Sequence, residues 1–218
     1  METKTLIIPR IEALEGLSNP DEIINLLDEK GVRGLIDCNN WPKAFPYTPL
    51  ATFVAGYTGT CLYIDFFVRC NYLRAVNSSD QSPVSEDSCV EFFVQPCPGG
   101  EYWNLEFNCI GAVNASHRLT RPVPTRLTSE EIARIRRFAS CGDRPFCEVE
   151  GLFSWNLLVA IPFGLMGIET VTPGTEMRGN FYKCASAASQ PHYLSWSPVA
   201  TDAPDFHRPE FFGKLIFE

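Results

Sequence analysis

Two segments of the chain, residues 87–94 and 102–108, alternate between apolar and other side chains with period two. The turn between them is rich in Pro and Gly, and this combination predicts a β-hairpin with a mid-length loop. Successive side chains on a strand point to opposite faces of a sheet. The predicted core face consists of Val90, Phe92, Val94, Trp103, Leu105 and Phe107. The predicted opposite face carries Glu91, Phe93, Tyr102, Asn104, Glu106 and Asn108.

This second face combines carboxylates, amides and aromatic rings. A polar, uncharged ligand with an apolar ring face suits such a surface, because hydroxyl groups pair with the polar side chains and C–H patches pack on the rings. A sugar has these properties.

The remainder of the chain is also typical of short strands joined by turns, with 17 Pro and 15 Gly mostly between apolar runs. Further strands are expected over residues 51–57, 61–70, 151–163, 178–184, 192–196 and 211–217. Helices are expected over residues 18–31, capped by Ser18 or Asn19 and ended by Gly31, and from Thr128 to about Phe138. The pattern predicts an all-β fold: a single antiparallel β-sandwich, immunoglobulin-like or jelly-roll-like, with one or two short peripheral helices. We expect residues 1–31 to form an N-terminal extension whose helix packs on the sandwich of residues 32–218.

The net charge and the hydropathy of the chain argue against two classes of partner, nucleic acids and membranes. A net charge of −8 opposes nucleic-acid binding, which needs clustered Lys and Arg, and the basic residues Arg134, Arg136 and Arg137 are expected on a solvated helix face. No apolar run approaches the length of a membrane-spanning helix. We therefore expect no nucleic-acid or membrane partner, and a monomer.

The nine Cys residues are odd in number, and their spacings fit no zinc motif. Five of them stand beside apolar residues in predicted strands and are expected to be free, buried thiols: Cys61, Cys70, Cys89, Cys109 and Cys184. Cys141 and Cys147 could pair if the protein is exported. Because residues 1–4 open without an apolar secretory segment, we expect a reducing, cytoplasmic location.

Five segments in order resemble motifs of the family 9 carbohydrate-binding modules and their relatives in the DOMON-like β-sandwich group. The matching segments are residues 87–93, 155–162, 177–182, 194–197 and 206–213, and the resemblance spans roughly residues 32–218. It implies a non-catalytic domain that binds a mono- or oligosaccharide derived from plant polysaccharides such as xylan or cellulose. Such modules are often attached to xylanases, and some hold structural calcium.

The resemblance also implies site residues. The family grips a sugar between two Trp side chains, with Glu, Arg and Asn reaching the hydroxyls, but residues 83–86 here contain no Trp at the expected first position. The candidate ligand-binding residues are Trp196, Phe206, Trp41, Glu91, Arg178, Asn180 and His207. The acidic side chains that could supply calcium ligands are Asp65, Asp80, Glu86 and Asp87.

Several alternatives stay open at this point. Trp196 follows Leu194 on an alternating strand and could equally belong to the core, while Glu91 could form an ion pair with Arg69, Arg178 or Lys183. A glycoside hydrolase would need paired carboxylates, for which the candidates are Glu86, Glu91 and Glu106. A haem-binding domain would need axial ligands, for which the candidates are Met166, Met177, His117, His192 and His207.

Overall fold

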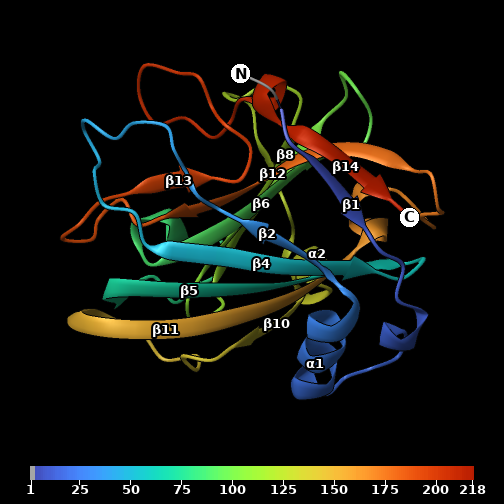
Figure 1. The fold of residues 1–218 in the computed structure, drawn as a ribbon, viewed down its shortest axis with the longest axis horizontal. Helices are drawn as coiled ribbons and strands as arrows, with labels where there is room; N and C mark the ends of the chain where they lie inside the picture. The colour runs from blue at the N-terminus through green and yellow to red at the C-terminus, as the bar shows by residue number, and fades with distance from the viewer. Residues whose placement is uncertain (1–2) are drawn as a thin grey trace.

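The computed structural model describes residues 3–218 as two β-sheets packed face to face (Figure 1). Sheet A has the strand order β1-β14-β12-β6-β7-β8-β9, with β13 and β3 attached beside β12, and sheet B has the order β10-β11-β5-β4-β2. The strands of sheet A are β1 (Thr5–Ile8), β3 (Cys38–Asn39), β6 (Cys89–Gln95), β7 (Tyr102–Asn108), β8 (Val113–Arg118), β9 (Thr125–Arg126), β12 (Glu176–Cys184), β13 (Tyr193–Ser195) and β14 (Gly213–Phe217). The strands of sheet B are β2 (Val32–Leu35), β4 (Leu50–Tyr57), β5 (Cys61–Ala75), β10 (Arg136–Ala139) and β11 (Phe146–Pro162).

The predicted sandwich is confirmed, and so is its hairpin. Strands β6 and β7 pair antiparallel, and the register sets Glu91 opposite Glu106 and Phe92 opposite Leu105. The core face predicted from the alternation packs between the sheets, whereas Cys89, Phe93 and Tyr102 belong to a second apolar cluster on the outer face of sheet A. The hairpin therefore separates a packed interior from a polar and aromatic surface.

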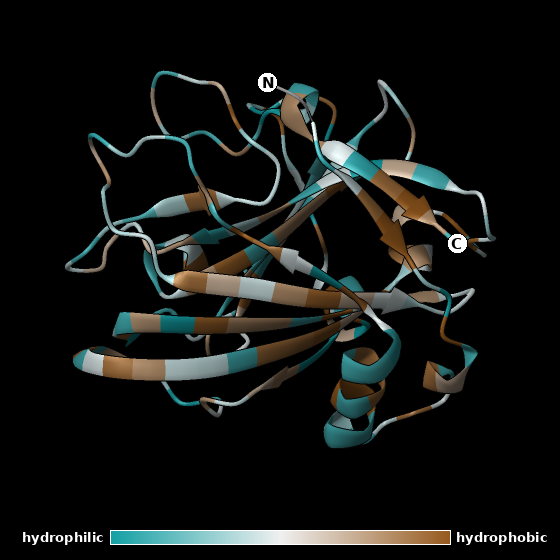
Figure 2. Ribbon diagram, in the orientation of Figure 1, coloured by the Kyte–Doolittle hydropathy of each residue, from teal (hydrophilic) through white to brown (hydrophobic). Residues whose placement is uncertain are grey.

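A group of aromatic rings joins the two sheets. Phe53 of β4 stacks on Phe181 of β12 with ring centroids 3.7 Å apart, and Phe66 and Phe92 pack around the same ring. Along β5 the predicted inward residues Leu62, Ile64, Phe66 and Val68 all lie in this core. The period-two pattern thus identifies the buried face of both sheets, and the hydrophobic stretches of the strands are visible in Figure 2.

Residues 3–31 contact both layers. Strand β1 pairs in parallel with β14 at the edge of sheet A, the one parallel strand pair among residues 3–218 apart from an isolated bridge between Arg10 and Tyr57. Helix α1 (Pro20–Lys30) begins at Asn19, whose side chain accepts a hydrogen bond from the backbone N–H of Asp21, and packs on β4. Pro at the first helical position and acidic residues in the first turn favour this start.

The second helix is shorter than expected. Helix α2 (Ser129–Ala133) has the predicted capping box between Thr128 and Glu131, but residues 136–139 leave the helix and pair with β11 as β10. The expected solvated helix face of arginines was therefore wrong. Arg136 lies over the ring of Tyr63, and Arg137 pairs with Asp80.

The five Cys residues predicted to be buried are buried, and Cys141 and Cys147 are both free thiols in the structure. Short 3₁₀ turns at Glu12–Leu14, Val84–Glu86, Phe163–Met166 and Pro209–Phe211 connect the strands. Within residues 3–218, no helix has the length and apolar character needed to cross a bilayer.

Asp65 is a buried charge on the outer face of sheet B. Its Oδ2 accepts a hydrogen bond from Asn156, its Oδ1 has no partner, and burial raises its pKa from 3.8 to about 6. Because the folded state binds this proton more tightly than the unfolded chain, the stabilising contribution is complete below pH 3.8 and is lost as the pH rises through about 6.

We therefore expect Asp65→Asn to raise the free energy of unfolding at pH 8 by about 1–3 kcal/mol. The gain is expected to vanish near pH 4, where Asp65 is protonated in the folded protein. Urea unfolding at both pH values measures it. Asp37→Asn, at an exposed carboxylate paired with Lys4, is the control. An Asp65→Asn gain that is equal at pH 4 and pH 8 would contradict the assignment.

Candidate functional site

The centre of the outer face of sheet A carries a row of polar side chains. The strand registers align Tyr182 of β12, Glu91 of β6, Glu106 of β7 and Asn114 of β8 as successive cross-strand partners. Residues paired in this way point to the same face, with neighbouring Cβ atoms roughly 4.5–5.5 Å apart. The sheet alone therefore brings two carboxyl groups side by side.

A cavity of about 310 Å³ lies over this row. The long connection between β13 and β14 closes the cavity on the side away from the sheet. Phe206 and His207 belong to this connection and line the cavity. That connection lies beside the loop of residues 40–49 (Figure 1), since Trp41 packs against Phe206 with ring centroids 6.1 Å apart. The floor and walls of the cavity include Glu91, Glu106, Asn114, Tyr193, Phe206 and His207. The remaining lining residues are Ser85, Phe93, Arg121, Cys184, Ser186, Pro204 and Asp205.

Glu91 forms part of the floor and is 3% exposed. Its Oε1 accepts a hydrogen bond from the thiol of Cys184 at 3.1 Å, and the Cys89 thiol is 3.8 Å away. Burial raises the pKa of Glu91 well above its usual range, and the neighbouring Cys184 and Glu106 raise it further. None of the ion pairs among residues 3–218 involves Glu91, so the predicted partners Arg69, Arg178 and Lys183 are not used.

Glu106 is held in place by amides. Asn104 Nδ2 donates to its Oε1 at 3.0 Å, and Asn114 Nδ2 donates to its Oε2 at 3.1 Å. Burial raises the pKa of Glu106, and these two hydrogen bonds oppose that shift. The chain of bonds continues from Asn104 to Ser116 and from Ser116 to Arg118, which fixes the side chains before any ligand enters.

His207 forms one wall. Its Nδ1 lies 3.2 Å from the Tyr102 hydroxyl, and its ring lies 5.0 Å from the ring of Phe93. Burial, with the positive charges of Arg118 and Arg121, lowers the pKa of His207 from 6.5 to about 3. A neutral imidazole has one donor and one acceptor nitrogen, so it can pair with a hydroxyl in either sense.

The aromatic wall is built in layers. Phe206 stacks on Tyr182 with centroids 4.1 Å apart and planes 15° apart, and it is 8% exposed. Tyr193 packs edge-on against Phe45 at 4.8 Å and is half-buried at the rim. Trp41 supports both rings from behind, and its indole N–H donates to the carbonyl oxygen of Thr201 at 2.7 Å. Trp41 therefore braces the wall and is absent from the lining.

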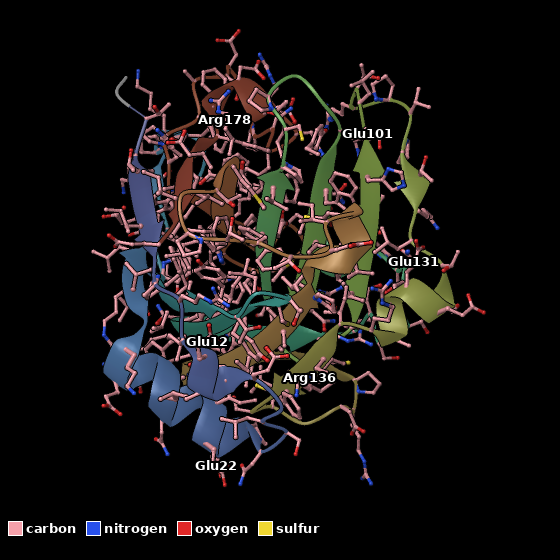
Figure 3. The ribbon with its side chains drawn as sticks, turned by 90° about the vertical axis from the view of Figure 1, so that its right-hand side faces the viewer. Glu12, Glu22, Glu101, Glu131, Arg136 and Arg178 are labelled. Atoms are coloured by element: carbon pink, nitrogen blue, oxygen red, sulfur yellow. The ribbon has the colours of Figure 1, made fainter. Side chains whose placement is uncertain are left out.

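Three of the predicted site residues lie elsewhere. Trp196 packs in the core between the sheets, edge-on to Phe53 and to Phe181. Arg178 sits near one end of sheet A (Figure 3), where it donates to the backbone carbonyl oxygens of Glu210 and Phe212.

Asn180 is fully buried, and its amide both donates to and accepts from the backbone of Ser197. The structure thus brings Glu91, Phe206 and His207 together at the cavity, with Trp41 behind them.

The other candidates have structural partners. Asp87 is fully buried, accepts from the backbone N–H groups of Val76 and Asn77, and pairs with Arg74. Asp80 pairs with Arg137, and Glu86 lies in the 3₁₀ turn before β6.

The haem-ligand candidates occupy separate surroundings. Met166 and Met177 lie in the core. His117 stacks on Trp103, and His192 bonds to Lys183.

Four lining residues were not predicted from the sequence: Asn114, Arg121, Ser186 and Tyr193. The alternation of residues 193–196 contained the signal for Tyr193, because Leu194 and Trp196 share the inner face and Tyr193 must then point outward. Asn114 could have been found only with the register of β8 against β7.

Comparisons with known proteins identify the family of this chain. The family model described as carbohydrate-binding family 9 matches residues 21–217. A crystal structure of a carbohydrate-binding protein candidate from Bacteroides uniformis is similar over 100% of both chains, with 34% identity and a TM-score of 0.93.

Two structures of a family 9 module from Caldicellulosiruptor kristjanssonii, in complex with glucose and with cellotriose, share the fold at 12% identity. Their TM-scores are 0.59 and 0.57, and the matches cover 99% of this chain and 96% and 94% of theirs. Among curated proteins the chain has no match. The matched length and the sandwich together show that this chain belongs to carbohydrate-binding family 9.

Proposed function

We propose that the cavity over β6 and β7 binds a mono- or short oligosaccharide derived from xylan or cellulose, without chemical conversion. The observation that carries the proposal is the pairing of Glu91 and Glu106 beneath the aromatic wall of Phe206 and Tyr193, inside a cavity of about 310 Å³. This volume lies at the small end of ligand cavities, about 300–1,000 Å³. It suits one or two sugar rings, such as the end of a chain.

The chemistry of the lining supports an uncharged ligand. Protonated Glu91 and neutral His207 each offer a donor and an acceptor, so sugar hydroxyls can bond to them without burying an unpaired charge. The exposed edges of Phe206 and Tyr193 provide apolar contact for ring C–H groups. The glucose and cellotriose complexes of the Caldicellulosiruptor module lend the sugar class further support.

Calorimetric titration with glucose, xylose, cellobiose, xylobiose and cellotriose tests the proposal. We expect saturable binding of at least one sugar, and we expect Phe206→Ala or Glu91→Gln to weaken it at least about tenfold, or about 1.4 kcal/mol. Glu101→Gln is the matched control, because Glu101 lies in the exposed loop between β6 and β7 (Figure 3) and pairs only with His117. Absence of binding by the unsubstituted protein to all five sugars would refute the proposal.

The register also sets Glu91 and Glu106 side by side, and a glycosidase uses a pair of carboxyl groups. Such an enzyme needs one ionised carboxylate as the nucleophile. Burial raises the pKa of both groups, which favours the neutral form of each. We therefore expect no release of aryl alcohol from aryl glucosides or xylosides. Hydrolysis that disappears in Glu91→Gln or Glu106→Gln would favour the enzyme instead.

A further inference from the structure

We infer that Cys89, Cys184 and Glu91 form a binding site for a thiophilic divalent cation of the zinc class at the floor of the cavity. Among residues 3–218, they are the one group of three His, Cys, Asp or Glu side chains whose ligand atoms converge, all within 4.8 Å of one another. All three side chains are buried. The inference goes beyond the proposed sugar binding and does not depend on it.

The sheet register builds this site. Cys89 and Glu91 are two residues apart on β6 and therefore share its outer face, while Cys184 on β12 is the direct cross-strand partner of Cys89. Both strands lie in the middle of sheet A, where each is paired on both sides. The three ligand atoms are consequently held by rigid backbone, which is the arrangement that fixes a metal geometry.

The distances match a small tetrahedral ion. Glu91 Oε1 lies 3.1 Å from Cys184 Sγ and 3.8 Å from Cys89 Sγ. Zn–S bonds of about 2.3 Å and Zn–O bonds of about 2.0 Å at tetrahedral angles set ligand atoms about 3.5–3.8 Å apart. The two oxygen–sulfur distances therefore need to change by only a few tenths of an ångström, and the two sulfur atoms already lie within 4.8 Å of each other. Two thiolates and one carboxylate select zinc over calcium or magnesium, which prefer oxygen ligands.

The surroundings leave room for the ion. Glu91 and Cys184 both line the cavity, so an ion can enter from that side and complete its coordination with a water or ligand oxygen there. In the metal-free chain the only hydrogen bonds to the Glu91 carboxyl come from the two thiols. On binding, the cation replaces the protons that these groups hold, and the protons pass to solvent.

Lys183, on the opposite face of β12, places a positive charge next to the backbone of Cys184. Lys183 is fully buried, and its Nζ lies 2.6 Å from the carbonyl oxygen of Cys184 and 2.8 Å from His192 Nε2. No carboxylate pairs with Lys183 among the described residues. Its ammonium group would balance the single net negative charge that two thiolates, one carboxylate and a divalent ion leave.

Titration of the reduced protein with Co²⁺, in the absence of carbohydrate, tests the inference. The variant used for this titration carries Cys97→Ser and Cys147→Ser, which remove the two exposed thiols. We expect one equivalent of Co²⁺ to produce a thiolate-to-cobalt charge-transfer band and tetrahedral d–d bands, and Zn²⁺ to displace it. Cys184→Ser or Cys89→Ser should abolish the charge-transfer band or weaken binding at least a hundredfold.

Cys109→Ser is the matched control, because Cys109 is equally buried but lies in the core, and its band should be unchanged. X-ray absorption of the zinc-loaded protein gives a readout that needs no variant, and should show two sulfur ligands at about 2.3 Å. No stoichiometric band, a band retained in both Cys89→Ser and Cys184→Ser, or a zinc shell without sulfur would overturn the inference. Since no sugar is present, the outcome is independent of the calorimetric test of carbohydrate binding.

Discussion

Phe181→Ala is expected to lower the free energy of unfolding by about 3–5 kcal/mol, a loss typical of removing a fully buried aromatic ring. Phe181 is completely inaccessible and stacks on Phe53 at 3.7 Å, so the substitution opens a cavity where the two sheets meet. Trp196 also packs against this ring, at 5.8 Å and edge-on. Urea unfolding followed by tryptophan fluorescence measures the loss.

The control for this prediction is Phe211→Ala. Phe211 is only partly buried, in the last 3₁₀ turn, where its ring lies under the guanidinium of Arg208. We expect this control to cost less than about 1 kcal/mol. A loss below about 1 kcal/mol for Phe181→Ala itself would show that the two sheets do not depend on this contact.

The fold could be predicted largely because the alternation of apolar and polar residues along a strand is a local property of the sequence. Period-two alternation assigned Phe92 to the core and Glu91 to the outer face without knowledge of any partner strand. The same alternation places Leu194 and Trp196 on one face but left open whether Trp196 binds a ligand or packs in the core, and the structure places it in the core. Helix α2 shows the limit, since the helix begins at its cap Thr128 as predicted but pairing of residues 136–139 with β11 ends it earlier than the sequence indicated.

The site was less predictable because long connections decide it. Arg178 and Asn180 point to the same face as Glu91, as the register requires, but the backbone at Phe212 and Ser197 takes up their hydrogen-bonding groups. The path of the connection after β13 determines those contacts, and no short-range pattern encodes it. Phe206 and His207 reach the cavity through the same connection.

His207→Gln is expected to flatten the acid side of the stability curve. In the folded protein the pKa of His207 is about 3, against 6.5 for a free side chain, so the unfolded chain binds more protons between these values. Stability from neutral His207 is therefore complete above pH 6.5 and falls as the pH drops toward 3, by up to about 1.4 kcal/mol per pH unit. The advantage of the unsubstituted protein over His207→Gln should shrink by about 2–4 kcal/mol between pH 7 and pH 4.

The difference between the two proteins isolates His207 from the opposing carboxyl groups. Asp65, Glu91 and Glu106 have raised pKa values and gain stability on acidification, but they are present in both proteins and cancel in the comparison. His117→Gln, at a surface ring beside Glu101, should retain the pH dependence because His207 is unchanged. Urea unfolding from pH 4 to pH 8 measures all three proteins. Parallel curves for His207→Gln and the unsubstituted protein would mean that the pKa of His207 in the folded protein is close to 6.5, and would contradict the lowering of that pKa by burial.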